Sequence, residues 1–490
     1  MTPRRWLTLG LLVLGGARFA GAQGRVVPAP VAPTRAARIV PAPRANQPRK
    51  PRAQARPKAA VKAPVKRAVA APPPTRVSAR VTRQPAPPPA APVMARTPGS
   101  ELSVTLITFG VGQAVWERFG HNALWIHDAK ASTDIAYNWG LFDFEQPGFL
   151  GRFLTGDTKY WMGGEDAYAM VSAYHNIGRP ITLQKLNLTP AQALALRDFV
   201  ERNAREENKY YRYDYFRDNC STRLRDAVDR AVGGALRAAT DTMRTPLSYR
   251  GESLRLTEGD MPVQTGIDIA LGQPADAPLS AWESFFIPMR LRDAVRIVRV
   301  PGANGELVPL VAEERDMAPA PGAHRVVEAR TAPDHTRRNL IAGLVLAAIV
   351  VLLRLLMRSQ RWAAWLLALF GMTWSLLCGA LGVALLLAWF ATKHAFWAQN
   401  ENLLLLSPVS LALVVLVPAA LLAGRAVRRA RVLASLVAVM GLAALVLSLR
   451  PEAQPIGAIV ALLLPTHVVL AWALFLYLPR RTEPKPAPKG

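Results

Sequence analysis

Five apolar runs in the last third of the chain limit its fold more than any other feature. A helix needs about 20 consecutive apolar residues to cross the hydrocarbon core of a bilayer, and each run is close to that length. Because backbone polar groups must be bonded internally in lipid, each run is predicted to be helical. We therefore expect an all-α membrane domain of five spans over residues 338–480. The runs cover residues 339–357, 362–390, 403–423, 432–449 and 456–478.

Basic residues are concentrated after the first, third and fifth runs, whereas the other two loops carry little charge. The positive-inside rule therefore places these three regions in the cytoplasm, including the tail over residues 481–490. Residues 23–337 and the loop over residues 392–402 are then expected on the outer side of the membrane. The basic residues are Arg354, Arg358 and Arg361, then Arg425, Arg428, Arg429 and Arg431, then Arg480, Arg481, Lys485 and Lys489.

Residues 1–22 have the three parts of a secretory signal peptide. Arg4 and Arg5 form the basic start, residues 6–16 are apolar, and Ala20-Gly21-Ala22 is a small-residue cleavage site. An uncleaved anchor is the alternative, but the apolar core is short for a membrane span. A secretory signal agrees with the orientation that the loop charges predict.

Residues 23–98 are a low-complexity segment rich in Pro, Ala, Lys and Arg. The net charge of the chain is +26, and sixteen Lys and Arg with no acid lie between Arg25 and Ser100. Much of the charge therefore belongs to a segment that cannot bury enough apolar surface to fold, which argues against a nucleic-acid partner. We interpret the segment as an extended tether. Attraction to anionic envelope polymers or lipid head groups is the alternative.

Residues 99–337 are predicted to form one α+β domain outside the membrane. The sequence Thr189-Pro190-Ala191-Gln192 is a capping box with proline at the first helical position, so a helix is expected from there to about residue 207. We interpret residues 301–337 as a loose connection to the membrane. Strands are expected over residues 102–109, 123–127 and 135–139.

Cys220 is the candidate nucleophile. The only other cysteine, Cys378, lies in an apolar run, so the pair is not a disulfide framework. An amphipathic helix begins at Cys220, and either Asp218 or Asn219 can cap it. The helix dipole and free N–H groups of the first turn then favour a thiolate. The simpler alternative is a buried cysteine that packs as a small apolar residue.

His121 is the best placed histidine to act as the base for that thiol. It begins an apolar strand, and a hairpin centred near residues 130–131 would bring Asn138 diagonally across from it. Asn138 is therefore the first choice to orient the ring, and Asp134 and Asp143 are weaker choices. His127, on the same strand face, is the alternative base. The alternative for His121 itself is a histidine that is simply satisfied in the core.

No metal or cofactor is expected, because one cysteine and scattered histidines lack the paired-ligand spacing of a zinc site.

The outer loop over residues 392–402 is a second candidate region. Its polar side chains would either shape the entrance for a substrate or dock the cysteine domain, and Lys393 could meet a lipid phosphate. An ordinary solvated loop is the alternative. The candidate substrate-binding residues are Lys393, His394, Asn400 and Asn402.

A histidine strand that precedes an Asn-Cys helix start reverses the ordinary papain order. It resembles the circularly permuted members of the NlpC/papain-like superfamily, which include the lecithin retinol acyltransferase group. Residues 101–300 more closely resemble the Lnb N-terminal periplasmic domain family, and residues 393–408 resemble the membrane part of that family. The segments that carry the resemblance are residues 119–126, 137–144, 210–222 and 281–288, then 393–394, 400–404 and 407–408.

The resemblance implies a papain-like fold of the circularly permuted NlpC type and an enzyme of lipoprotein N-acylation in the bacterial inner membrane, with its catalytic domain in the periplasm. An acyl chain would move from a phospholipid donor, through a thioester on Cys220, to the amino terminus of a lipoprotein acceptor. Cys220 would be the nucleophile and His121 the base. The alternatives are a papain-like cell-wall amidase or peptidase, and a non-enzymatic envelope scaffold, sensor or transport component.

Overall fold

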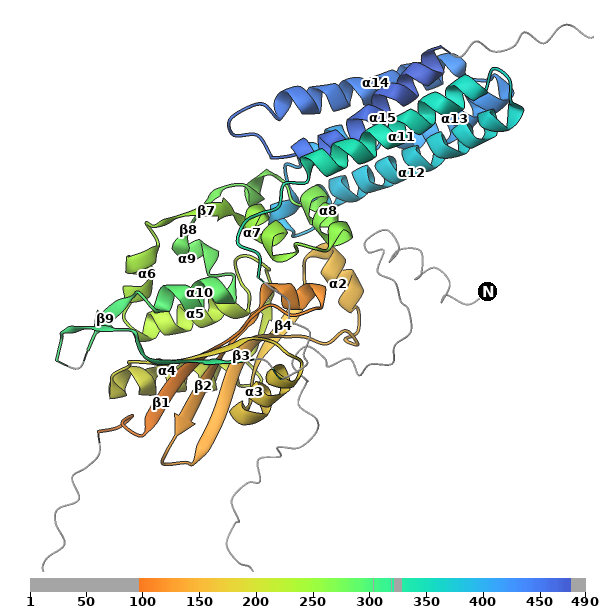
Figure 1. Ribbon diagram of the computed structural model, residues 1–490. Helices are drawn as coiled ribbons and strands as arrows, with labels where there is room; N and C mark the ends of the chain where they lie inside the picture. Colours follow the sequence, from red (N-terminus) through yellow and green to blue (C-terminus); the bar gives the residue numbers. More distant parts are fainter. Residues whose placement is uncertain (1–96, 303, 319, 321–327, 477–490) are drawn as a thin grey trace, which may run out of the picture. The chain divides into compact units, whose positions relative to one another are not determined.

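The computed structural model describes residues 97–302, 304–318, 320 and 328–476. The predicted signal peptide over residues 1–22, almost all of the predicted tether over residues 23–98, and the predicted tail over residues 481–490 lie outside these residues. The described chain forms a mixed α/β domain that is followed by a helical region, as the sequence predicts (Figure 1).

A seven-stranded antiparallel sheet forms the centre of the α/β domain, in the order β11-β5-β1-β2-β3-β4-β6. The three predicted strands are its middle strands β1, β2 and β3. Residues that we interpreted as a loose connection instead form β11, which pairs with β5 at the sheet edge. The bounds are β1 Leu102–Phe109, β2 His121–Asp128, β3 Thr133–Leu141, β4 Lys159–Asp166, β5 Ile181–Leu186, β6 Tyr210–Arg212 and β11 Val311–Met317.

The β2–β3 hairpin has the register that the sequence predicts. Leu124 pairs with Tyr137 and Asp128 pairs with Thr133, so the turn is centred between residues 130 and 131. Successive side chains of a strand point to opposite faces of the sheet. This register therefore puts His121, Ala123 and Asn138 on one face.

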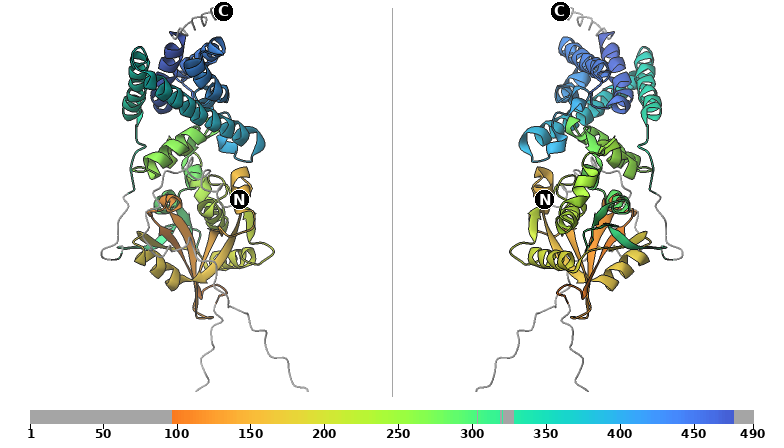
Figure 2. Two further views of the ribbon diagram at one scale, coloured as in Figure 1. Left: turned by 90° about the vertical axis from the view of Figure 1, so that its right-hand side faces the viewer. Right: turned by 90° about the vertical axis from the view of Figure 1, so that its left-hand side faces the viewer.

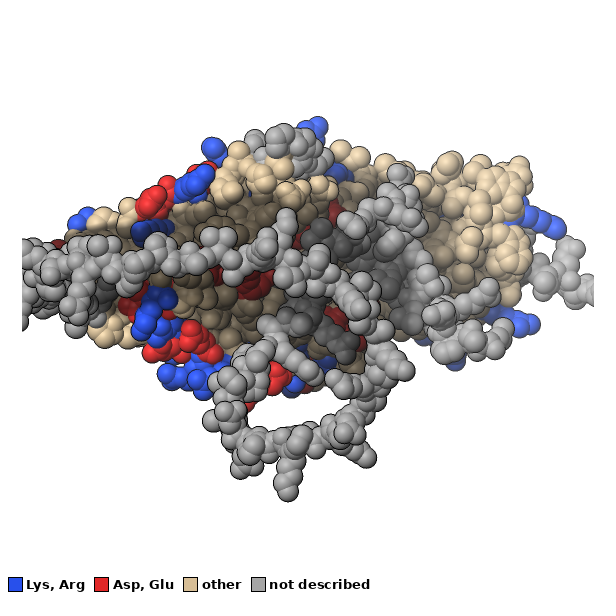
Figure 3. Space-filling model, turned by 90° about the horizontal axis from the view of Figure 1, so that it is seen from below, with Lys and Arg blue, Asp and Glu red and all other residues tan. Residues whose placement is uncertain are grey.

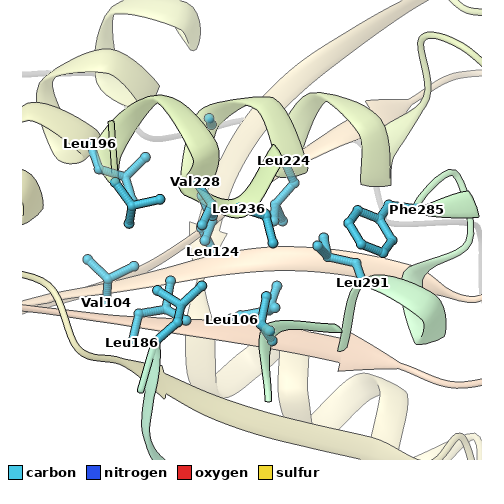
Figure 4. Packing of buried hydrophobic residues seen from close by; sticks show 14 of the residues in the cluster. Val104, Leu106, Leu124, Leu186, Leu196, Leu224, Val228, Leu236, Phe285 and Leu291 are labelled. Carbon is cyan, nitrogen blue, oxygen red and sulfur yellow. The ribbon is translucent and has the colours of Figure 1, made fainter. Parts of the chain in front are cut away.

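Each face of the sheet is covered by helices. On one face, Val104, Leu106 and Leu124 pack under α4 (Pro190–Asn203), α5 (Cys220–Ala231) and α10 (Pro288–Val295) (Figure 4). On the other face, Phe109 and Ala123 pack under α3 (Ala167–Asn176). Each fully buried aliphatic side chain contributes about 1.5–3 kcal/mol relative to an exposed one, so this double cover stabilises the strand order. The predicted capping box is present at α4, which ends at Asn203 rather than near residue 207.

Short elements complete the α/β domain. Two of them, α7 and α8, lie beside the connection to the helical region. The bounds are η2 Val115–Phe119, α2 Phe149–Thr155, α6 Ala235–Thr240, β7 Arg244–Ser248, α7 Tyr249–Leu256, α8 Met261–Ala270, η3 Gln273–Ala275, β8 Pro278–Ser280, α9 Ala281–Ser284, β9 Arg299–Pro301 and β10 Leu307–Pro309.

The helical region contains α11 (Thr336–Leu356), α12 (Arg361–Ala391), α13 (Ser410–Ala423), α14 (Val427–Leu447) and α15 (Gly457–Phe475). In the part of the chain that the structure describes, four of these helices are long and apolar enough to cross a membrane, and α13 has only 14 residues. The predicted third span, residues 403–423, is divided into η5 (Glu401–Leu404) and α13. The Ser407-Pro408 pair explains the break, because proline disfavours helical geometry in the preceding residue.

The helices of this region pack closely and leave an apolar surface. A Cβ on Gly382 of α12 would lie 2.0 Å from the carbonyl oxygen of Leu406, so only glycine permits this approach. Small residues of this kind are typical of contacts between membrane helices. Figure 2 shows the helices side by side, and in Figure 3 the charged residues gather over the α/β domain rather than over this region.

A buried ion cluster holds α7, α8 and the loop after α8 together. The guanidinium of Arg250 lies 3.0 Å from Asp268 Oδ1 and 2.7 Å from Asp276 Oδ1, and it also donates to the carbonyl of Leu271. All three ionic side chains have little contact with solvent. Removing one member of such a cluster leaves the others as uncompensated buried charges.

We predict that Arg250→Ala lowers the free energy of unfolding by about 3–5 kcal/mol. The control is Arg296→Ala, because Arg296 pairs with Glu314 near the surface, where an ion pair contributes about 1 kcal/mol or less. Thermal unfolding of the full-length protein in detergent measures both. Equal effects of the two substitutions would contradict the prediction.

Candidate active site

Cys220 is the first residue of α5, and Asn219 caps the helix. Asn219 Oδ1 accepts hydrogen bonds from the N–H groups of Ser221 and Thr222, each at 2.9 Å. Its Nδ2 donates to the carbonyl of Phe286, which ties the cap to the segment before α10. The other candidate cap, Asp218, instead pairs with Arg223. A cap of this kind contributes about 1 kcal/mol, so the start of the helix, and with it the thiol, is held in place.

The thiol of Cys220 is buried, and its surroundings favour the protonated form. Burial raises the pKa of Cys220 to about 11, and the N–H groups at the helix start oppose this rise only in part. The nearby Arg179 cation also opposes it. The sequence prediction that the first helical turn favours a thiolate is therefore outweighed by desolvation, which disfavours the charged form.

His121 is held by Asn138, as the predicted register allows. His121 Nε2 lies 3.1 Å from Asn138 Oδ1, and both residues are buried. Because the amide oxygen accepts, Nε2 donates its proton and Nδ1 keeps the lone pair of a base. Burial lowers the pKa of His121 to about 4; Arg179 acts in the same direction, and the hydrogen bond to Asn138 opposes them. The ring is therefore neutral at neutral pH.

The two strands that carry His121 and Asn138 also approach Cys220. The backbone N–H of Asn122, the residue after His121, lies beside the thiol. A Cβ on Gly140 would lie 3.1 Å from Cys220 Cβ, and Gly140 has a φ of +90° where the β3–β4 register shifts. Among the described residues, no hydrogen bond joins Cys220 to His121. The resting site thus has a neutral thiol beside the backbone of Asn122, and the neutral His121 ring stacks with Phe109 and Tyr174.

A cavity of about 390 Å³ opens at Cys220. Its wall is mostly apolar and combines three parts of the chain: the α/β core, the end of α8, and the segment after α12. Gly120 lines it, whereas the next residue, His121, does not. Large lining residues are Trp116, Phe153, Tyr160, Tyr213, Phe216, Ile267, Leu271, Phe286 and Trp397.

The four candidate residues of the outer loop fall into two pairs. Lys393 and His394 line the cavity; Lys393 Nζ lies 2.8 Å from Asp157 Oδ1, and His394 Nε2 donates to the carbonyl of Phe153 at 3.0 Å. Asn400 and Asn402 do not line it. Their side-chain amides instead donate to the last carbonyls of α8, those of residues 268–270. Those carbonyls have no partner within the helix, so the asparagines dock the loop on the domain.

The other candidates for orienter and base are placed elsewhere. Asp134 accepts from Trp125 and lies 3.0 Å from His127 Nδ1, at the far end of β2 from His121. Asp143 accepts from a backbone N–H of its own turn. Neither carboxylate therefore orients His121, and His127 is remote from the thiol.

The sequence prediction missed Arg179 and Asn122. Arg179 is buried, donates to the carbonyls of Gly110 and Phe109, and lies over the ring of Tyr174. Its positive charge favours both a thiolate at Cys220 and a neutral His121. Asn122 is fully buried, and neither side-chain polar atom has a partner among the described residues. No motif marks Arg179, and Asn122 was visible only as the neighbour of His121.

One comparison with known proteins finds a family. Residues 92–250 match the family model described as the Lnb N-terminal periplasmic domain, and this segment contains Cys220, His121 and Asn138. No curated protein and no solved structure matches the chain. The match places the chain with the Lnb-type proteins over residues 92–250, and the described part of the helical region has four helices long and apolar enough to cross a membrane.

Proposed function

We propose that this protein is a thiol-dependent N-acyltransferase of the bacterial inner membrane, which moves an acyl chain from a phospholipid to the amino terminus of a lipoprotein. The observation that carries the proposal is the apolar cavity of about 390 Å³ that begins at a capped, buried cysteine. The thiol lies at the backbone of Asn122, the residue after the His121 that bonds to Asn138. An acyl chain needs apolar walls, and its ester carbon must meet a nucleophile at one end of the cavity.

The first step forms a thioester on Cys220. His121 Nδ1 takes the Sγ proton as Sγ attacks the ester carbonyl of the phospholipid. The N–H groups that lie at the thiol, including those of Asn122 and Cys220, stabilise the oxyanion. The C–O bond then breaks, and the imidazolium returns its proton to the leaving alkoxide, so that a lysophospholipid departs.

The second step transfers the acyl chain to nitrogen. The free amine of the acceptor's N-terminal cysteine attacks the thioester carbonyl, and His121 removes a proton from that amine. The C–S bond breaks, the amide forms, and the proton returns to Cys220. The residue is again a neutral thiol.

The buried, neutral resting state suits this chemistry. A thioester that persists between two steps must be protected from water, and the cavity wall is largely apolar. A thiol whose pKa is about 11 is not deprotonated at rest, so proton removal accompanies attack on a bound ester. The apolar wall also favours a lipid over the polar glycan or peptide that a cell-wall amidase would bind.

A papain-like core is part of the proposal. A cysteine at the start of α5, a histidine at the start of β2 and an asparagine on β3 share one end of an antiparallel sheet. The Cys–His–Asn combination is that of papain-like enzymes. In chain order the histidine precedes the cysteine, which supports the circularly permuted form.

We further propose that the chain crosses the membrane five times, with the α/β domain in the periplasm and the C-terminus in the cytoplasm. Only residues 424–426 separate α13 from α14. The segment over residues 403–409 precedes α13 in the same apolar run, and Leu405 and Leu406 pack with Ile456 at the start of α15. The contacts of Lys393 and Asn400 support a location of the outer loop on the same side as Cys220.

Cys220→Ser and His121→Ala should each reduce acyl transfer by at least about 100-fold, because the first removes the nucleophile and the second its base. Mass spectrometry of lipoproteins from cells that carry only the variant measures N-acylation. Cys378→Ala is the matched control, because Cys378 is buried within the helical region. Full activity of both active-site variants would exclude the mechanism and favour a scaffold.

The acid limb of the pH–rate profile should lie near pH 4 rather than near pH 6.5. The folded pKa of His121 is depressed to about 4, so the neutral base is present above that pH and is lost as the pH falls through it. The initial rate of Cys220 acylation, measured on the full-length protein, tests this. A limb near pH 6.5 would show that the imidazole is not desolvated in the working enzyme.

Asn138→Ala should slow the reaction by about 10- to 100-fold, because the ring of His121 loses the partner that fixes its orientation. His127→Ala should leave the rate unchanged, since His127 pairs with Asp134 at the other end of β2. The same acylation assay compares the two variants. The opposite ranking would make His127 the base.

A further inference from the structure

The helix α2 is apolar, yet no residue of it is buried. Four of the seven residues in Phe149–Thr155 are Phe or Leu, and the side chains of Leu150 and Leu154 are 53% and 52% exposed. A helix on the surface of a water-soluble domain normally turns its apolar side chains to the core. The exposed apolar face of α2 therefore needs another explanation.

Further exposed aromatic and aliphatic residues adjoin α2. The Trp116 and Phe144 rings are 5.9 Å apart, and the Phe144 and Phe149 rings are 5.3 Å apart. We call this surface the α2 patch, and it consists of Val115, Trp116, Phe144, Leu150, Phe153 and Leu154, all exposed. Contiguous exposed apolar surface of this kind marks a binding surface or a membrane contact.

The end of α2 is bonded to the residues that follow the membrane helix α12. The N–H of Lys393 donates to the carbonyl of Thr155 at 2.8 Å, and His394 Nε2 donates to the carbonyl of Phe153. A Cβ on Gly156, which ends α2 with a φ of +70°, would lie 3.1 Å from His394 N. Because α12 is long and apolar enough to cross a membrane and ends at Ala391, these bonds hold α2 beside the end of a candidate membrane span.

The α2 patch is also the rim of the Cys220 cavity. Trp116 and Phe153 belong to both the patch and the cavity wall. The adjacent Lys393 belongs to the cavity wall only. Aromatic residues with a neighbouring cation are typical of the boundary between lipid head groups and acyl chains. One surface thus joins the lipid level to the thiol.

We propose that the α2 patch lies in the outer leaflet of the membrane, and that a lipid tail enters the Cys220 cavity sideways from the bilayer, past Trp116 and Phe153. The bond between α2 and the end of α12 favours lipid over a second copy or another protein as the occupant. The contact with lipid does not depend on the reaction. The entry of a tail toward Cys220 rests on the proposed acyl transfer.

The first experiment replaces Leu154 by the photocrosslinker benzoylphenylalanine in the full-length protein. The protein is placed in vesicles of phosphatidylethanolamine and phosphatidylglycerol. The matched control is the same replacement of Ile297, which is 67% exposed and follows α10. We expect phospholipid adducts at position 154 at about tenfold the level at position 297. Equal adduct levels, or a crosslinked protein dimer in place of lipid adducts, would overturn the proposal.

The second experiment compares Leu150→Glu and Leu154→Glu with Ile297→Glu. None of these residues lines the cavity. Acylation of Cys220 is measured from vesicle phospholipid and, separately, from a short-chain, water-soluble ester. A charge at the lipid boundary should slow the vesicle reaction about tenfold and leave the soluble reaction unchanged.

The two readouts separate this inference from the proposed function. Loss of both reactions in the α2 variants would mean that the patch only supports the fold, and loss of neither would mean that lipid does not enter there; each result overturns lateral entry. Lipid adducts at position 154, in a protein that never acylates Cys220, would sustain the membrane contact and refute the acyltransferase.

Discussion

The pairing of β2 with β3 in a single register is the constraint on which the site depends. It places Asn138 against His121 and brings Gly140 under Cys220, so the two strands position the three candidate residues relative to one another. A slip of one residue would turn His121 to the opposite face of the sheet. Helices cover both faces, and such a slip would expose apolar side chains on each of them, so the fold itself protects the register.

Burial then decides the chemical state of the site. Desolvation raises the pKa of Cys220 and lowers that of His121, which leaves both groups neutral although they lie near a helix N-terminus and a buried arginine. A neutral pair differs from the thiolate–imidazolium pair that a low-pKa cysteine would form. It suits the proposed reaction, in which Cys220 is deprotonated only when an ester is bound in the apolar cavity.

The helical region contributes to the cavity as well as to membrane attachment. Lys393, His394 and Trp397 form part of its wall, and Asn400 and Asn402 satisfy the last carbonyls of α8. A Cβ on Gly272 would lie 1.8 Å from the carbonyl oxygen of Ala398, so backbone meets backbone at this contact. The cavity would lack one wall in an isolated α/β domain, which is why the experiments use the full chain.

The sequence by itself determined the features that depend on local spacing: the β2–β3 register, the capped helix at Cys220 and the apolar runs, because strand period, turn centre and caps involve neighbouring residues. The break at Ser407-Pro408 was harder to predict from the sequence, because a single residue pair is a weak signal. The strand β11 was also harder to predict, because a polar strand at a solvent-facing sheet edge lacks an apolar pattern. Only the tertiary structure decided the protonation states, the place of Arg179 and the exposed apolar side of α2. Each of these depends on which distant residues exclude water or approach a charge, and that is a property of the packed chain.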